Sequence, residues 1–373
     1  MPNQPVRSGS VVARRYRATR RIASGAMGEV WEGVHVELGT RVAIKVLRKE
    51  AFECREMVMR FAREALLLAR IQSEHVVRVI DYVERGKHGP VLVMELLEGP
   101  TFADIVHRER VPIDEAVDVA IDVLRGLQAM HAAHVIHRDV KPGNIVLRQT
   151  SDGRRRAVLI DLGVGRLVEH EEADGSIDIE IEELTTSDRV VGTLEYMAPE
   201  QILDCQNADA SVDVYAVGAL LFRAVSGVHP FGDKRGVELI REKIHRPVPP
   251  LRTGRRDGIA RRFEAIVQRS IAFKAKERYQ NADELLADLE RLRRDMRAQI
   301  SPTLLPTRHL RPIVPPPLPT MRVRARKRKV AIFAAAACAA LFAACTSAYG
   351  GAHADVPAPA KAAADDDSAE VCR

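Results

Sequence analysis

The chain has 373 residues, with 57 Lys and Arg against 51 Asp and Glu, which gives a formal net charge of +6 at pH 7. Six positive charges and no acids lie in Arg322 to Lys329 (RVRARKRK), so the other residues sum to about zero. This local patch argues against a basic nucleic-acid-binding face, and we expect no nucleic-acid partner. The five cysteines show no metal-ligand spacing, and no internal repeat stands out.

The first hundred residues predict a small lobe that is mostly antiparallel sheet with one helix. Residues 21–31 (RIASGAMGEVW) predict a strand, a glycine-rich turn and a second strand, and residues 42–45 (VAIK) predict a further strand. Residues 60–71 have the apolar spacing of a packed helix, which carries Glu64. Residues 91–99 (VLVMELLEG) predict a buried strand that runs into a polar turn.

The next two hundred residues predict a mainly helical large lobe. Residues 114–131 and 283–296 have helical apolar spacing with acids at their starts. A folded stretch of this length normally splits into two lobes, and the cleft between lobes is the default site for a nucleotide.

One motif in the large lobe carries the groups needed for phosphoryl transfer. Residues 137–144 read HRDVKPGN, and Asp161-Leu162-Gly163 begins seventeen positions after Asn144. Asp139 can accept a proton from a hydroxyl substrate, and Lys141 can neutralise the transferred phosphate. Asn144 can hold one Mg²⁺, while Asp161 can hold the bridging one. The order and spacing of these groups indicate a phosphoryl transferase.

With these residues the sequence resembles the eukaryotic-type (Hanks-type) protein kinases, and the D-x-K-P-x-N form of the loop points to the Ser/Thr branch. The sequences SGAMGEVW and YMAPEQ resemble the corresponding sequences of the bacterial, membrane-anchored members. The resemblance covers about three quarters of the chain and implies an α+β, two-lobed kinase fold, with an N-terminal tail at 1–13 and a domain at 14–297 that divides into a small lobe at 14–95 and a large lobe at 96–297. It departs at Ala23, where the G-x-G-x-x-G-x-V pattern has its first glycine, but the second glycine, Gly25, is kept where the chain should cross the phosphates.

The resemblance also implies a set of site residues. The catalytic residues are Asp139, Lys141, Lys45 and Glu64, where Glu64 is the preferred ion-pair partner of Lys45 and Glu56 the weaker one. The nucleotide-binding residues are Ile22, Gly25, Gly28, Val30, Ala43, Lys45, Met94, Glu95 and Leu97, the metal ligands are Asn144 and Asp161, and Thr193 positions the substrate. The implied cofactors are ATP and Mg²⁺ or Mn²⁺, and the implied partners are protein substrates with Ser or Thr.

Three supporting contacts and one regulatory segment are implied as well. Glu200, in the APE sequence at 198–200, should pair with buried Arg278. Asp213 should support the backbone of the motif at 137–144, called the catalytic loop from here on. An apolar stack of Leu68, His137 and Leu162 should align the lobes. The acidic segment 169–183 precedes Thr185 and Thr186, which we expect to be autophosphorylated. The alternative is that the acids already satisfy Arg138 and no switch is needed.

The last part of the chain predicts a membrane anchor. Residues 301–320 contain seven prolines and predict an extended spacer within a basic juxtamembrane linker at 298–329. Residues 330–348 are nineteen residues without a charge, enough for a spanning helix, although ten are Ala and a surface helix is the alternative. The cations before this segment predict a single-pass protein of the inner membrane, with the kinase domain cytoplasmic and the tail at 349–373 outside. Lipidation at Cys345, within a lipobox-like sequence, and a homodimer are further possibilities.

The resulting hypothesis is a membrane-anchored Ser/Thr protein kinase that transfers the γ-phosphate of ATP and autophosphorylates. The competing hypothesis is a membrane-anchored pseudokinase scaffold that binds nucleotide or partners without phosphoryl transfer. Only Ala23 favours the scaffold, because inactive relatives usually lose the Lys, the catalytic Asp or the metal-binding Asp, and this chain keeps Lys45, Asp139 and Asp161.

Overall fold

A computed structural model describes residues 4–25, 28–151, 153–162, 194–203 and 209–300. The chain divides into two units, residues 1–303 and 304–373, and the second lies outside the described residues. The strands are β1 (Val11–Val12), β2 (Tyr16–Ser24), β3 (Gly28–His35), β4 (Arg41–Leu47), β5 (Val79–Val83), β6 (Val91–Glu95), β7 (Ile145–Gln149) and β8 (Arg155–Leu159). The α-helices are α1 (Lys49–Glu53), α2 (Arg55–Leu68), α3 (Phe102–Val106), α4 (Ile113–Ala132), α7 (Pro199–Leu203), α8 (Ser211–Ser226), α9 (Gly236–His245), α10 (Gly258–Ser270) and α11 (Ala282–Ile300), and short 3₁₀ turns lie at Pro142–Asn144 and Ala275–Glu277.

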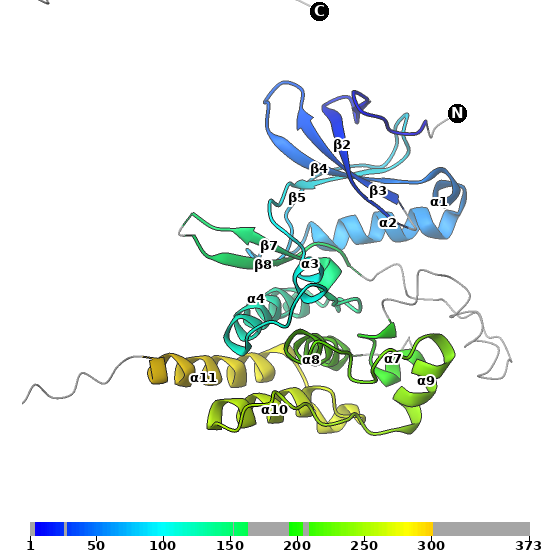
Figure 1. The fold of residues 1–373 in the computed structure, drawn as a ribbon. Coiled ribbons are helices and arrows are strands. Elements are labelled where there is room, and N and C mark those ends of the chain that lie inside the picture. The colour runs from blue at the N-terminus through cyan, green and yellow to red at the C-terminus, as the bar shows by residue number, and fades with distance from the viewer. Residues whose placement is uncertain (1–3, 26–27, 152, 163–193, 204–208, 301–373) are drawn as a thin grey trace, which may run out of the picture. The chain divides into compact units, whose positions relative to one another are not determined.

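The small lobe is a six-stranded antiparallel sheet in the order β1-β2-β3-β4-β6-β5, with α1 and α2 beside it (Figure 1). Strand β4 shows the alternation that a sheet imposes on its side chains. Val42, Ile44 and Val46 belong to one apolar cluster, whereas Ala43 belongs to the main core on the other side. Lys45 therefore shares the face of Ala43, toward the large lobe.

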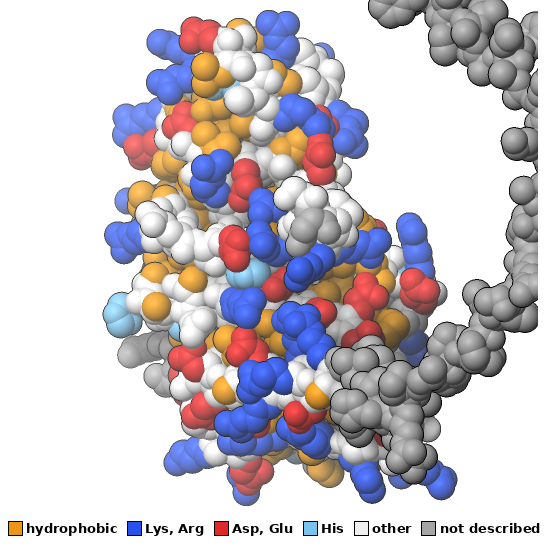
Figure 2. Space-filling view, turned by 90° about the vertical axis from the view of Figure 1, so that its left-hand side faces the viewer, with side chains coloured by type: hydrophobic (Ala, Val, Ile, Leu, Met, Phe, Trp, Pro, Cys, Tyr) orange, Lys and Arg blue, Asp and Glu red, His pale blue; other side chains and the backbone are white. Residues whose placement is uncertain are grey.

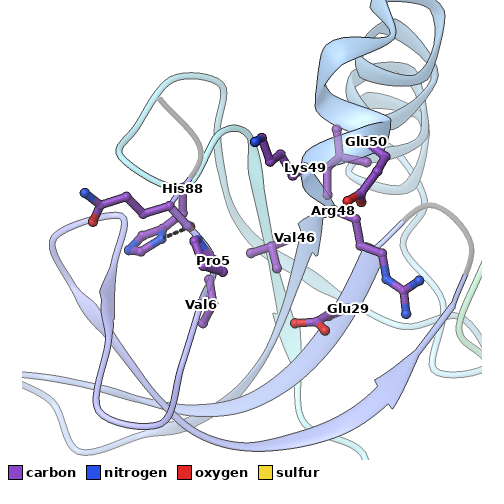
Figure 3. Close-up of a pocket in the computed structure, with 10 residues that line it drawn as sticks. Pro5, Val6, Glu29, Val46, Arg48, Lys49, Glu50 and His88 are labelled. Atoms are coloured by element: carbon purple, nitrogen blue, oxygen red, sulfur yellow. Dashed lines mark hydrogen bonds between the residues drawn. The ribbon is translucent and has the colours of Figure 1, made fainter. Parts of the chain in front are cut away.

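Residues 4–13 differ from the expected tail, because they pack on the sheet. Val6 and Val12 are buried, and β1 pairs with β2. The Gln4 carbonyl lies 2.6 Å from Nδ1 of His88. Between this N-terminal segment, Val46 and Lys49 lies a cavity of about 320 Å³ (Figure 3). This cavity lies on the outer face of β4. A second cavity, lined by Ala43 and Lys45, lies on the inner face of the same strand.

The small lobe has two helices where the sequence predicted one, and the second begins earlier than expected. Helix α2 starts at Arg55 and ends at Leu68, against the predicted range of 60–71. Its buried side chains are Phe61, Glu64, Ala65 and Leu68, which follow helical spacing. In the turn before Phe61, Met57 and Val58 are only partly buried against the core, so the apolar pattern is weaker there.

The large lobe is built around α8, which packs against α4 and α10 (Figure 1). Nearly every side chain of α8 from Val212 to Phe222 is buried, as expected for a helix that is apolar on all sides. The helices predicted at 114–131 and 283–296 are confirmed, with small differences at their ends. Backbone hydrogen bonds from Val77 to Leu159 and from Leu159 to His75 join the two lobes behind the cleft.

Basic and acidic side chains are interspersed over the face shown in Figure 2. Arg125 pairs with Glu290 and Arg293 pairs with Asp118, and both pairs join α11 to α4. Such exposed pairs each contribute little to stability, typically about 0 to 1 kcal/mol.

Several sequence predictions fall outside the described residues. These are Thr185, Thr186, Thr193, the basic linker from residue 301 onward, the span at 330–348 and the tail at 349–373. Among the helices that the structure does describe, none combines the length and the apolar character needed to cross a bilayer.

Candidate active site

A cavity of about 460 Å³ lies between the two lobes, a size that suits a small-molecule ligand. Every predicted nucleotide-binding, metal-binding and catalytic residue of the described part lines it. Ala23 and Leu96, which lie within the loop and the strand end expected at the nucleotide, line it too, and the lining residues that the sequence did not indicate are Ser24, Val77, Gly143, Val146 and Ile160. Strand alternation after Asn144 and the position directly before Asp161 could have revealed Val146 and Ile160.

The glycine-rich turn lines one side of this cavity with Gly25 and Gly28. A side chain is unfavourable at each of these two positions for a different reason. The N–H of Gly25 donates to the Gly28 carbonyl at 2.9 Å and closes the turn. A Cβ at Gly28 would lie 2.1 Å from the Val46 carbonyl oxygen, so strand packing already excludes a side chain there. A Cβ at Gly25 would meet nothing closer than 4.0 Å, so the protein itself leaves this side open for a ligand. The expected role in phosphate approach therefore fits Gly25 better than Gly28.

Lys45 bridges two acids at the back of the cavity. Its Nζ lies 2.6 Å from Oε1 of Glu64 and 2.8 Å from Oδ1 of Asp161. The predicted Lys45–Glu64 ion pair is thus present, and Glu64 is 3% exposed. The alternative partner, Glu56, lies in the first turn of α2 and accepts a hydrogen bond from Cys54 Sγ instead. The register of α2 explains the choice, because Glu64 shares the buried face with Phe61 and Leu68.

The ammonium group of Lys45, which contacts both acids, influences the pKa values of Glu64 and Asp161. Burial alone would lower the pKa of Lys45, but Asp161 and Glu64 outweigh it and raise that pKa. Burial, only partly opposed by Lys45, raises the pKa of Glu64 above its usual range. Burial would raise the pKa of Asp161, but the Lys45 charge together with hydrogen bonds from Glu64 and Lys45 outweighs it, so the pKa of Asp161 is lowered. Asp161 therefore remains a carboxylate near neutral pH, as a metal ligand must.

The catalytic loop brings three polar side chains together. Oδ2 of Asp139 accepts hydrogen bonds from Nζ of Lys141 at 2.8 Å and from Nδ2 of Asn144 at 3.0 Å. The 3₁₀ turn at Pro142–Asn144 folds Asn144 back, and its Nδ2 also donates to the Asp139 carbonyl at 2.9 Å. Asp139 is 8% exposed, so its orientation is fixed by these contacts at the edge of the cavity.

The backbone of this loop is held in an uncommon conformation. Arg138 has a φ of 64°, which costs a non-glycine residue free energy and persists only where the surroundings compensate. Asp213 of α8 is fully buried and accepts hydrogen bonds from the N–H of His137 at 2.9 Å and of Arg138 at 2.8 Å. Nε2 of His131 lies 2.8 Å from the same carboxylate. The predicted support by Asp213 is therefore present.

The donor set in the cavity suits a hard divalent cation. The Nδ2 of Asn144 is used by two acceptors on Asp139, which leaves the amide Oδ1 as the atom available for a cation. The Asp161 carboxylate lines the same cavity. A carboxylate together with an amide oxygen matches the oxygen ligands that Mg²⁺ and Mn²⁺ prefer.

The remaining predicted contacts lie below the cavity. Nη1 and Nη2 of Arg278 donate to Oε1 and Oε2 of Glu200 at 2.6 and 2.8 Å, a bidentate pair. Arg278 also donates to the carbonyls of Ala272 at 2.6 Å and Phe273 at 2.9 Å. The three residues of the expected apolar stack, Leu68, His137 and Leu162, are all buried.

Comparison with known proteins agrees with this geometry. Residues 16–297 match the family model described as protein kinase domain. The chain is 35% identical over 278 residues to the serine/threonine-protein kinase pkn2 of Myxococcus xanthus, covering 74% of this chain and 32% of that protein. It is 36% identical over 250 residues to PknA of Mycobacterium tuberculosis, covering 66% and 54%, and 34% identical over 283 residues to PknL of the same organism, covering 76% and 66%.

The aligned region spans between about a third and two thirds of the length of these relatives. Among solved structures, the PknI kinase domain of Mycobacterium tuberculosis is similar with a TM-score of 0.56 and 23% identity, covering 77% of this chain and 100% of that one. At this identity the similarity concerns the fold alone.

Proposed function

Because this chain belongs to the protein kinase domain family, we propose that it is a Ser/Thr protein kinase that transfers the γ-phosphate of ATP to protein hydroxyls. The observation that carries the proposal is the convergence of Lys45, Asp139, Lys141, Asn144 and Asp161 on one cavity. Each of these polar side chains already contacts another of the set. The site is therefore organised for its chemistry before any ligand binds.

Asp139 is the group that would receive the acceptor hydroxyl. Its carboxylate would orient the hydroxyl and take its proton as the oxygen attacks the γ-phosphorus and the bond to ADP breaks. Lys141, 2.8 Å from Asp139, would offset the charge of the phosphoryl group during transfer. Lys45, held by Glu64, would reach the α and β phosphates beneath the glycine-rich turn. Mg²⁺ or Mn²⁺, held by Asp161 and Asn144, would neutralise phosphate charge.

The pseudokinase scaffold remains the second candidate, with Ala23 as its only supporting observation. Ala23 lies in β2, pairs with Val30 and lines the cavity, so its methyl group replaces a glycine without disrupting the strand. Since Lys45, Asp139 and Asp161 are all in place, the geometry favours the enzyme.

Transfer of labelled γ-phosphate distinguishes the two candidates. We expect the purified protein, with ATP and a divalent cation, to label Ser or Thr of an acceptor protein. Lys45→Met should lower this labelling by at least about 100-fold, because Met fills the volume but supplies no charge to the phosphates. Lys49→Met, at an exposed lysine of the neighbouring helix, is the matched control and should retain activity. Nucleotide binding without any transfer by the unmodified protein would favour the scaffold.

We also propose autophosphorylation at Thr185 or Thr186. Both follow an acid-rich segment, and Arg138 lies directly before Asp139. A phosphate of charge about −1.5 to −2 near Arg138 could order the segment through charge-assisted hydrogen bonds. Mass spectrometry of the active protein should find phosphate between Glu182 and Arg189. An unphosphorylated segment, together with full activity of the Thr185→Ala, Thr186→Ala double variant, would leave no support for this switch.

We further propose that residues 330–348 anchor the chain in the inner membrane with the folded domain in the cytoplasm. The support is the uncharged segment itself and the six cations directly before it. In a bacterial host the full chain should pellet with membranes and resist extraction by high salt. A chain ending at Thr320, which lacks the cations and the apolar segment, should stay in the supernatant. Release of the full chain by salt alone would indicate a surface helix instead.

A further inference from the structure

Helix α9 carries a lysine in an apolar setting. Lys243 is 1% exposed and lies on the same helical face as Leu239 and Ile240. That face packs against Leu194 and Met197 in a cluster separate from the main core. The cluster therefore joins α9 to the segment that leads into α7.

The ammonium group of Lys243 contacts the backbone of this segment. Nζ donates to the Met197 carbonyl at 2.6 Å and to the Glu195 carbonyl at 3.1 Å, and it lies 5.1 Å from the ring centroid of Tyr215. No carboxylate of the described residues forms an ion pair with it, and burial lowers the pKa of Lys243 to about 7. A leucine or methionine would fill the same space without this cost. The contacts with the two carbonyls therefore explain why a lysine is present.

Helix α7, which follows the turn at Glu195–Met197, contacts the catalytic loop. Gln201, in α7, donates from Nε2 to the Arg138 carbonyl at 2.9 Å, one residue before Asp139. The turn has a second side-chain contact, because Nε2 of His229 lies 2.9 Å from Oε2 of Glu195. Neither the turn nor Lys243 lines the nucleotide cavity. Through Gln201 and Arg138 the turn is thus linked to the residue that would receive the acceptor hydroxyl, while the turn itself lies outside the lining of the nucleotide cavity.

On the basis of the proposed kinase activity, we propose that Lys243 is a positioning residue that fixes the Glu195–Met197 turn and thereby sets the affinity for the acceptor protein, but not for ATP. Without its amine the two carbonyls lose their donor, and the turn moves relative to Asp139. The expected signature is a rise in KM for the acceptor with an unchanged KM for ATP.

Steady-state kinetics of the full chain test this with a Thr-containing peptide that the unmodified protein phosphorylates. Lys243→Met keeps the volume of the stem and removes the donors, and its peptide KM should rise about tenfold, as expected for losing hydrogen bonds of ordinary strength. Its ATP KM should stay within about twofold of the unmodified value. Lys234→Met is the matched control, because Lys234 pairs with Glu238 and Glu242 rather than with the turn. An unchanged peptide KM, or equal rises in both KM values, would overturn the proposal.

Amide hydrogen exchange separates this inference from the proposed function. Exchange at 194–198 should be faster in Lys243→Met than in Lys234→Met, whether or not the protein transfers phosphate. If no phosphate is transferred by the unmodified protein, the proposed function fails and the claim about acceptor affinity fails with it, while faster exchange would still support the fixed turn.

Should Lys243→Met not fold, Lys243→Gln, which keeps a shorter amide donor, is used in its place. Its peptide KM should lie above that of the unmodified protein, and an unchanged value would contradict the assignment.

Discussion

Replacing Asp139 by Asn should lower kcat for phosphate transfer by about 10²- to 10⁴-fold, the range typical of losing a positioned general base. The side chain keeps its shape, and its amide oxygen can still accept the hydrogen bonds from Lys141 and Asn144. The loop should therefore keep its conformation, supported by Asp213 through the N–H groups of His137 and Arg138.

Two measurements separate this chemical effect from a folding defect. Labelled phosphate transfer gives kcat, and the ADP-dependent rise in Tm reports on folding and on the nucleotide site together. We expect Asp139→Asn to keep the thermal shift and lose turnover. A variant with near-normal turnover would contradict the role of Asp139. Loss of the thermal shift would show instead that the loop had rearranged.

Replacing Glu200 by Ala should lower the free energy of unfolding by about 3 kcal/mol, the lower end of the range for breaking a buried ion pair. The Arg278 side chain has no exposure, so loss of Glu200 leaves its charge with the carbonyls of Ala272 and Phe273 and the ring of Tyr215, none of which carries a negative charge. We expect a loss at the low end of the range because the Glu200 side chain is 31% exposed, so water can partly replace the missing carboxylate beside Arg278. Denaturant unfolding of the variant and the unmodified protein gives the difference.

A double variant and an exposed pair provide the controls for this prediction. Adding Arg278→Met to Glu200→Ala should recover part of the lost stability, because no buried charge then remains unpaired. Glu290→Ala removes an acid from the exposed pair with Arg125 and should cost less than about 1 kcal/mol. Equal losses for Glu200→Ala and Glu290→Ala would show that burial of Arg278 adds nothing to the pair.

Much of the site was predictable because its chemistry restricts residue types at short spacing. Asp139, Lys141 and Asn144 lie within six residues, and the 3₁₀ turn at Pro142–Asn144 brings them together. Pairs distant in sequence, such as Lys45 with Glu64 and Glu200 with Arg278, were predicted from the resemblance. The packing of the tertiary structure is what makes these contacts.

The fold was predictable where one face of an element is apolar and the other polar. The helical spacing of α4 gave the correct helix in the correct place, whereas β4, which is buried on both faces, was predicted from the VAIK sequence instead. The first turn of α2 was missed because it buries no side chain fully. The sequence predicts a tail at 1–13 because Val6 and Val12 are too few to form a pattern, and only their contacts with the sheet bury them.

The reacting groups can be identified from the sequence, because proton acceptance, phosphate binding and metal binding each require particular side chains. What surrounds these groups depends on the packing of the folded chain. In the sequence, Gly28 reads as a glycine for phosphate approach, but the Val46 carbonyl beside it already excludes a side chain. Lys243 reads as one more charge on a polar helix, yet the fold buries it against two carbonyls. Burial depends on residues far away along the chain, so local composition could not reveal either role.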